Sequence, residues 1–191
     1  MTQPTSDLKP ERTFKKPDVG ARRTRLREFQ ANLVERMQAA RSGADTRTSQ
    51  LGVMIGQTRW LLNLQEAGEI VSVGTITKVP LTQDWFLGLT NIRGNLISVV
   101  DLARFRGHAP SQIDKGSRIV AFAPSLSFNS GLLVSRVLGL HHVSEMKPHK
   151  NDMGEATPWA AQSYVDKESQ VWTELNLSLV VQDPQFLHVS L

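Results

Sequence analysis

The sequence predicts a mainly β fold, a barrel or sandwich architecture, preceded by one amphipathic α-helix. From Leu51 onward the apolar residues recur with a period of two in short runs, and Gly, Pro, Asn and Ser separate these runs at close spacing. Many short strands joined by tight turns are typical of barrels and sandwiches. Before Leu51 the apolar period is helical instead.

The chain divides into three parts on this pattern. Residues 1–19 contain three prolines among scattered charges, which predicts a disordered basic tail. Residues 20–48 are expected to form an amphipathic helix and a linker, and residues 49–191 a single β domain. The helix is predicted over 21–41, where one apolar stripe is formed by Leu26, Phe29, Leu33, Met37 and Ala40. Such a stripe either packs on the protein's own β domain or binds a partner, and the sequence leaves both open.

The elements expected in the β domain follow in order. A hairpin over 51–64 turns at Gly56-Gln57-Thr58. Further strands are predicted at 69–73, 96–100, 118–122, 131–135, 137–141, 163–165, 171–175 and 186–189. Helical turns are predicted at 83–87, after Thr82 as N-cap, and at 177–181, and a mobile polar loop at 147–156.

The most informative stretch runs from Gly88 to Leu102 and reads G-L-T-N-I-R-G-N-L-I-S-V-V-D-L. Gly94 tolerates a positive φ and marks a turn, and the β-rich run 96–100 after it suggests a strand buried on both faces. Arg93, held at the mouth of that strand, suits recognition by another protein. Its alternative role is a structural salt bridge to Glu69 or Asp101, and the two roles are compatible. Asp101 is expected to cap the backbone N–H groups that follow it.

The positive charge of the chain lies in its amino-terminal part. The formal net charge is +4, but residues 1–48 hold 11 of the 22 Lys and Arg residues and 6 of the 18 Asp and Glu residues. The β domain itself is therefore nearly neutral, which argues against nucleic acid as its partner.

Catalytic and metal-binding patterns are absent from the sequence. It has no cysteine, no nucleotide-binding glycine motif, no G-x-S-x-G and no H-E-x-x-H. His141 and His142 are adjacent on a predicted strand and so point to opposite faces, which disfavours a shared metal ion. Neither a signal-peptide h-region nor a membrane-spanning apolar run occurs. We therefore expect a cytoplasmic protein without enzymatic activity, cofactor, metal or membrane insertion.

The segment from Val79 to Leu102 resembles the signature of the CheW-like adaptor domain of bacterial chemosensory systems. In that signature V-P is followed by a short helix, G, N-[LI]-R-G, an apolar strand and D-L. Gly68-Glu69-Ile70 and the run Gly131-Leu132-Leu133-Val134 with Val137 resemble further motifs of the family. The likeness covers about residues 51–187.

This resemblance implies two five-stranded β-barrels lying side by side around a shared core. It also implies a non-catalytic adaptor that couples the tip of a methyl-accepting chemoreceptor to a CheA-type histidine kinase. The receptor tip would lie in the groove between the barrels. Carried over by position, the residues expected to contact it are Arg93, Gly94, Asn91, Gly88, Glu69 and Ala67. The positions that contact the kinase are left open.

Two departures from the family pattern and one extension complete the comparison. Ser135 replaces an aspartate, and Ala67 replaces a larger valine, which predicts a shallower groove. The amino-terminal extension of nearly 50 residues, together with W-F-L-G at Trp85–Gly88, resembles the adaptors of systems that control type IV pili and twitching motility. The alternatives are a generic adaptor of the flagellar type and, from a different class, a nucleic-acid-binding β-barrel.

Overall fold

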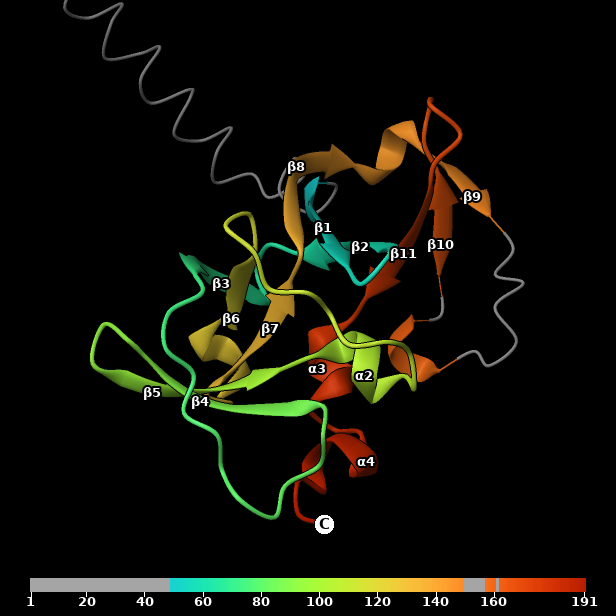
Figure 1. Ribbon diagram of the computed structural model, residues 1–191. Helices are drawn as coiled ribbons and strands as arrows, with labels where there is room; N and C mark the ends of the chain where they lie inside the picture. Colours follow the sequence, from blue (N-terminus) through green and yellow to red (C-terminus); the bar gives the residue numbers. More distant parts are fainter. Residues whose placement is uncertain (1–48, 150–156, 161) are drawn as a thin grey trace, which may run out of the picture. The chain divides into compact units, whose positions relative to one another are not determined.

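The computed structural model describes residues 49–149, 157–160 and 162–191, and its strands form two sheets (Figure 1). The predicted tail over 1–19, the amphipathic helix and linker over 20–48, and residues 150–156 of the predicted loop lie outside the described residues. The mainly β fold is confirmed.

The first sheet contains six strands in the order β8-β1-β2-β11-β10-β9. Every pair in it is antiparallel except β2 and β11, which run parallel. The hairpin predicted at the start of the domain is confirmed, with Gly56 at a φ of 58° in its turn. The bounds are β1 (Ser49–Ile55), β2 (Thr58–Asn63), β8 (Arg136–His142), β9 (Lys147–His149), β10 (Ser163–Val165) and β11 (Val171–Leu175).

The second sheet contains five strands in the order β3-β6-β7-β5-β4. Its bounds are β3 (Ala67–Ser72), β4 (Phe86–Ile92), β5 (Asn95–Val100), β6 (Arg118–Phe122) and β7 (Ser130–Val134). Five strands per sheet were expected. The first sheet has a sixth because β9 forms where a loop was predicted and pairs with β10.

The second sheet closes on itself through the segment that follows β3. Thr77 and Leu89 exchange two backbone hydrogen bonds of 2.8 Å, and the Thr90 hydroxyl donates to the Thr75 carbonyl at 2.9 Å. Because β3 and β4 are the two outer strands of this sheet, the bridge joins its two edges. Figure 1 shows this segment running from β3 towards β4.

Gly88 permits this close approach of the two edges. Its φ is 130°, and a Cβ built on it would lie 2.2 Å from the carbonyl oxygen of Thr77. Only glycine adopts this backbone conformation readily while leaving that space free. Gly88 is therefore a requirement of the fold.

The strands β6 and β7 are buried on both faces and separate two apolar clusters. On β6, Ile119 and Ala121 face one cluster while Val120 and Phe122 face the other, which is the two-residue period of a strand. The smaller cluster belongs to the closed second sheet and consists of Ile92, Ile97, Val99, Ile119, Ala121 and Leu133.

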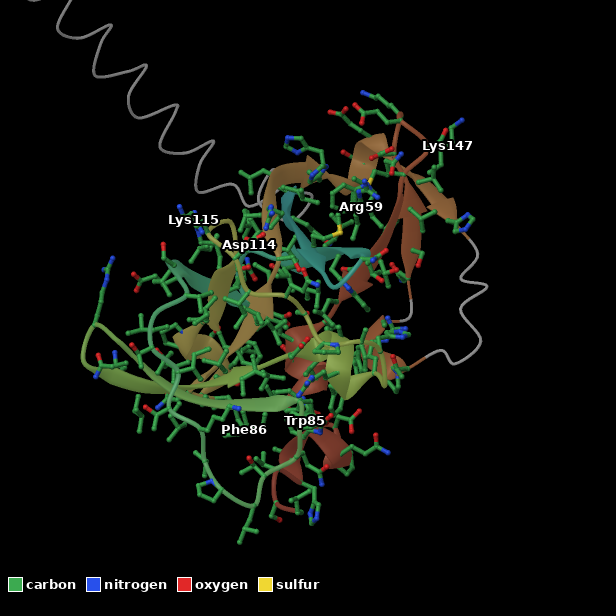
Figure 2. All side chains as sticks on the ribbon, viewed as in Figure 1. Arg59, Trp85, Phe86, Asp114, Lys115 and Lys147 are labelled. Atoms are coloured by element: carbon green, nitrogen blue, oxygen red, sulfur yellow. The ribbon has the colours of Figure 1, made fainter. Side chains whose placement is uncertain are left out.

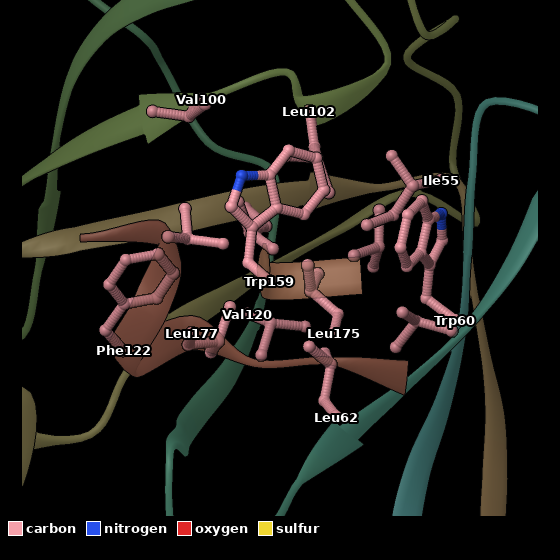
Figure 3. Close-up of a cluster of buried hydrophobic side chains, with 14 of the residues drawn as sticks. Ile55, Trp60, Leu62, Val100, Leu102, Val120, Phe122, Trp159, Leu175 and Leu177 are labelled. Carbon is pink, nitrogen blue, oxygen red and sulfur yellow. The ribbon is translucent and has the colours of Figure 1, made fainter. Parts of the chain in front are cut away.

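The larger cluster contains residues of both sheets and of the short helices (Figure 3). Trp60 of β2 and Trp159 of the 3₁₀ helix η3 (Pro158–Ala160) lie in it with ring centroids 6.3 Å apart. The two sheets therefore share one core, as the family resemblance implied.

The prediction of two-faced burial for β5 holds only for its second half. Val99 and Val100 face different clusters and are buried, whereas Leu96 is 58 % exposed. Leu96 is exposed because it lies next to the tip of the β4–β5 hairpin, where no other element of the described chain covers it.

Two short helices form where the sequence places good caps. The buried Asp101 carboxylate accepts hydrogen bonds from the Ala103 and Arg104 backbone at the start of α2 (Leu102–Phe105), which confirms its predicted capping role. The same carboxylate accepts from the Ser111 backbone N–H at 2.7 Å and from its hydroxyl at 2.8 Å. Asn176 caps α3 (Leu177–Val180), within the helical turn predicted there.

Two predicted elements were wrong. A helical turn was expected at 83–87, but Gln83 and Phe86 form a single turn and β4 begins at Phe86, because pairing with β5 outweighs the local helical preference. A strand was expected at 186–189, but the helix α4 (Pro184–Leu187) forms there, since Asp183 caps it and Pro184 occupies its first turn. The apolar Phe186 is buried in this helix and stacks on Trp85.

Candidate partner-binding surface

Arg93 and Gly94 form the two-residue turn of the β4–β5 hairpin. The strands on either side are paired up to Ile92 and Asn95, and both turn residues have positive φ, 50° for Arg93 and 89° for Gly94. Two positive φ angles match the type I′ turns that suit the twist of a hairpin. The Asn91 side-chain oxygen accepts a hydrogen bond of 2.9 Å from the Gly94 N–H and so fixes the turn.

Arginine is an unusual residue at the first position of such a turn. Asn, Asp and Gly adopt a positive φ there at lower cost than a long side chain does. Residues held in sparsely populated backbone conformations are concentrated at functional sites. The conformation of Arg93 therefore points to a role for its side chain outside the fold.

The guanidinium of Arg93 forms an ion pair with Glu69. Nη2 of Arg93 lies 2.8 Å from Oε1 of Glu69, and the side chains are 80 % and 34 % exposed. The sequence offered two partners for Arg93, and in the structure the partner is Glu69. Asp101 is buried, and its carboxylate caps the start of α2 instead. Glu69 is on β3 and Arg93 at the tip of the hairpin that contains β4, so the pair joins elements from opposite edges of the second sheet.

The pair contributes little to stability, and it leaves most of the guanidinium accessible. Exposed ion pairs are worth about 0.2–1 kcal/mol, because water and salt screen them. Arg93 can therefore keep its contact with Glu69 and still offer N–H donors to a second group. Exposed apolar side chains lie beside both partners in the sequence, Ile70 (40 % exposed) and Leu96 (58 % exposed).

The remaining residues of the predicted contact set differ in what they can do. Asn91 and Gly94 shape the turn, as described above. Ala67 is half-buried and packs against the larger core cluster. Gly88 is buried, so its part is to hold β4 in place and not to touch a partner.

A cleft of about 700 Å³ lies elsewhere, next to residues of the first sheet. It is lined by the β1–β2 turn, α2, the loop that follows α2 and the junction between β7 and β8. None of the six residues predicted to contact a receptor lines it. The structure thus places Arg93 on an exposed hairpin tip and not in this cleft.

Sequence reasoning missed the charged residues of that cleft. Arg106 lies over the ring of Trp60, with its Cζ 5.1 Å from the ring centroid. Arg136 of β8 forms a bidentate pair with Asp114, with both N–O distances 2.8 Å, and Asp114 is labelled in Figure 2. These contacts join residues that are far apart in the sequence, and the residues belong to no sequence motif that would have revealed them.

The histidines of β8 lie on opposite sides of the strand. His141 stacks on Trp172 with ring centroids 4.1 Å apart, whereas Nδ1 of His142 lies 3.0 Å from the Ser49 hydroxyl. Within the described residues, no group of three or more His, Cys, Asp or Glu side chains is arranged to hold a metal ion. In the same part of the chain, no helix is long and apolar enough to cross a membrane.

Comparison with known proteins agrees with this fold. The two-sheet architecture with a shared core is similar to that of a solved scaffolding protein. The crystal structure of the scaffolding protein TtCheW from Thermoanaerobacter tengcongensis superposes with a TM-score of 0.61 at 20 % sequence identity, over 72 % of this chain and 90 % of that one. The family model of the CheW-like domain matches residues 49–185, and the chain belongs to this family.

Three curated relatives come from three different organisms. The chain is 29 % identical to the protein PilI of Pseudomonas aeruginosa over 118 residues, which are 62 % of this chain and 63 % of PilI. It is 27 % identical to FrzA of Myxococcus xanthus over 47 % of this chain and 55 % of FrzA. It is 25 % identical to the chemotaxis protein CheW of Thermotoga maritima over 60 % of this chain and 74 % of CheW. The matched part thus spans less than two thirds of the length of PilI and of FrzA.

Proposed function

We propose that this protein is a non-catalytic, cytoplasmic adaptor that couples the tip of a methyl-accepting chemoreceptor to a CheA-type histidine kinase. Its membership of the CheW-like family supports this role. The observation that carries the proposal within the structure is the exposed ion pair of Arg93 and Glu69, held on the strained turn of a hairpin.

The Arg93–Glu69 surface is the proposed receptor contact. A guanidinium whose backbone is fixed by the turn, and whose side chain is oriented by a carboxylate, loses little conformational freedom when a partner binds. Arginine is also enriched among the residues that dominate interface energies. Ile70, next to Glu69 in the sequence, and Leu96 at the start of β5 are exposed apolar side chains on the same elements.

The six predicted residues divide into two groups within this proposal. Arg93 and Glu69 contact the receptor. Asn91 and Gly94 set the turn, Gly88 holds the closed sheet, and Ala67 anchors β3 to the core. The positions that contact the kinase are not assigned.

The chemosensory system of this adaptor is proposed to be the one that controls type IV pili and twitching motility. The likeness to PilI supports it. A generic adaptor of the flagellar type is the second candidate, because the sequence identities to PilI, FrzA and CheW lie close together, at 29 %, 27 % and 25 %. In either case we propose that residues 1–48 are an extension in front of the adaptor domain, which itself spans residues 49–191 and inserts into no membrane.

A pulldown from the host's own extracts tests the adaptor function. The full-length protein and the variant Arg93→Ala are immobilised separately, and the captured proteins are identified by mass spectrometry. The proposal expects a CheA-type kinase on both and a chemoreceptor on the wild type alone. Capture of neither would contradict the adaptor function, and capture of nucleic acid alone would favour the different class of β-barrel protein.

A deletion in the host separates the two chemosensory systems. Loss of twitching with normal swimming assigns the protein to the type IV pilus system. Loss of swimming with normal twitching assigns it to a flagellar system. Complementing the same strain with Arg93→Lys tests whether the guanidinium itself is needed, because lysine retains the charge and loses the planar fork of donors.

A further inference from the structure

The cleft between the β1–β2 turn and the loop after α2 contains a guanidinium that pairs with no carboxylate among the described residues. Its volume of about 700 Å³ lies within the range of small-molecule sites. Its floor is the indole of Trp60, which is 1 % exposed, and Arg106 lies over that ring.

Arg106 differs from the cations that form ion pairs within the described residues. Arg93, Arg104, Arg136 and Lys167 each lie within 4.0 Å of a carboxylate. Arg106 is half-buried, and its guanidinium forms neither an ion pair nor a hydrogen bond with any residue that the structure describes. Partial burial lowers the pKa of this guanidinium, because burial disfavours the charged form.

The second guanidinium that lines the cleft is already paired. Arg136 and Asp114 form a bidentate pair at the rim of the cleft. The buried Asp101 carboxylate is close in sequence, but its oxygens already accept bonds from α2 and from Ser111. Among the described residues that line the cleft, Arg106 therefore has the one guanidinium that pairs with no carboxylate.

We propose that this cleft binds a carboxylate attached to an apolar body. The planar fork of Arg106 matches the two oxygens of a carboxylate. Apolar residues line part of the cleft beside polar ones, and these apolar residues are Ile55, Leu102, Ala103, Ala109 and Pro110. A phosphate dianion fits less well, because it would meet only one free cation. The carboxylate comes either from a free organic acid or from an acidic side chain of a protein partner.

Titrations of the full-length protein test this site and its two sources. Two-dimensional amide NMR follows the addition of phenylacetate in one arm and of the peptide acetyl-Phe-Glu-Phe-amide in the other. The neutral analogues are phenylacetamide and the same peptide with Gln in place of Glu. We expect shifts at the amides of Gly56, Ala103 and Arg106 with at least one of the two acids, and binding of its neutral analogue about tenfold weaker or worse.

The variant Arg106→Met, which keeps the length of the side chain without its charge, is expected to lose the difference between acid and neutral analogue. Arg104→Met is the matched control, since Arg104 is on α2, which ends directly before Arg106, but its guanidinium donates to the Asp84 carbonyl and does not line the cleft. Binding by phenylacetate identifies a free acid as a ligand, and binding by the peptide alone identifies a protein side chain. Equal binding of acid and neutral analogue to the wild type, or no binding of either acid, would overturn the proposal even if Arg106→Met does not fold. None of these outcomes depends on the adaptor function, because no receptor or kinase is present.

Discussion

Nη2 of Arg93 and Oε1 of Glu69 lie 2.8 Å apart, although the two residues come from elements at opposite edges of the second sheet. This contact exists because the segment after β3 bridges to β4 and closes the sheet. The position of the candidate recognition residue thus depends on a backbone contact elsewhere in the same sheet, between Thr77 and Leu89.

The ion pair itself is expected to contribute little to folding. In a double-mutant cycle with Arg93→Ala and Glu69→Ala, chemical denaturation should give a coupling energy of about 0.2–1 kcal/mol, because both charges are exposed. A coupling several times larger would show that Arg93 is mainly a structural residue.

Gly88 is expected to tolerate no side chain. In Gly88→Ala the new Cβ would collide with the Thr77 carbonyl, and the φ of 130° would be strained, so we expect a loss of about 3 kcal/mol or more in the free energy of unfolding. Gly94→Ala is the control, since its Cβ would meet nothing within 4 Å and only the φ of 89° opposes it, at about 1–2 kcal/mol. Equal losses for the two variants would show that the closure of the sheet does not depend on Gly88.

Asp101 is expected to contribute more to the free energy of unfolding than an ordinary helix cap does. Asp101→Ala removes the cap of α2 and also the two bonds from Ser111, so we expect a loss of about 3 kcal/mol in unfolding free energy. Asn176→Ala removes a cap whose side chain accepts one bond, from Leu179, and should cost about 1 kcal/mol. Thermal or chemical denaturation compares the two, and a larger loss for Asn176→Ala would contradict this ranking.

Asp114 is expected to report on its pair with Arg136 through pH. The hydrogen bonds from Arg136 and from the Gly116 backbone lower the pKa of Asp114 from 3.8 to about 2. Since the folded-state pKa is the lower one, the stability from this group is fully present above pH 3.8 and is lost as the pH falls towards 2. The carboxyl ¹³C signal should titrate near 2 in the wild type and closer to 3.8 in Arg136→Gln. An unchanged midpoint in the variant would mean that the pair does not form in solution.

The local pattern of apolar and turn residues was sufficient to predict most of the strands. The runs at 118–122, 163–165 and 171–175 have in the structure the bounds that their apolar pattern predicted, because turn residues end each run. The last helix was missed because Phe186 and Leu187 suggested a strand, whereas the cap at Asp183 and the proline after it favour a helix. Here the capping chemistry outweighed the apolar pattern.

The candidate site was only partly predictable. Glu69 could be named as a partner of Arg93, but the choice between it and Asp101 required the position of β3 relative to the hairpin. The buried place of Gly88 could not be foreseen, because the contact with Thr77 is made by two backbones. Arg106 escaped notice for a similar reason, since only the folded chain brings it over Trp60.

The most direct test of the central claim is the affinity of the purified protein for a chemoreceptor tip fragment, measured by calorimetry for the wild type and for Arg93→Ala. The account predicts binding at least about tenfold weaker in the variant, with a melting temperature within about 4 °C of the wild type. Arg104→Ala, which changes an arginine away from the hairpin, should bind like the wild type. Unchanged receptor affinity in a folded Arg93→Ala would contradict the claim that the Arg93–Glu69 surface binds the receptor.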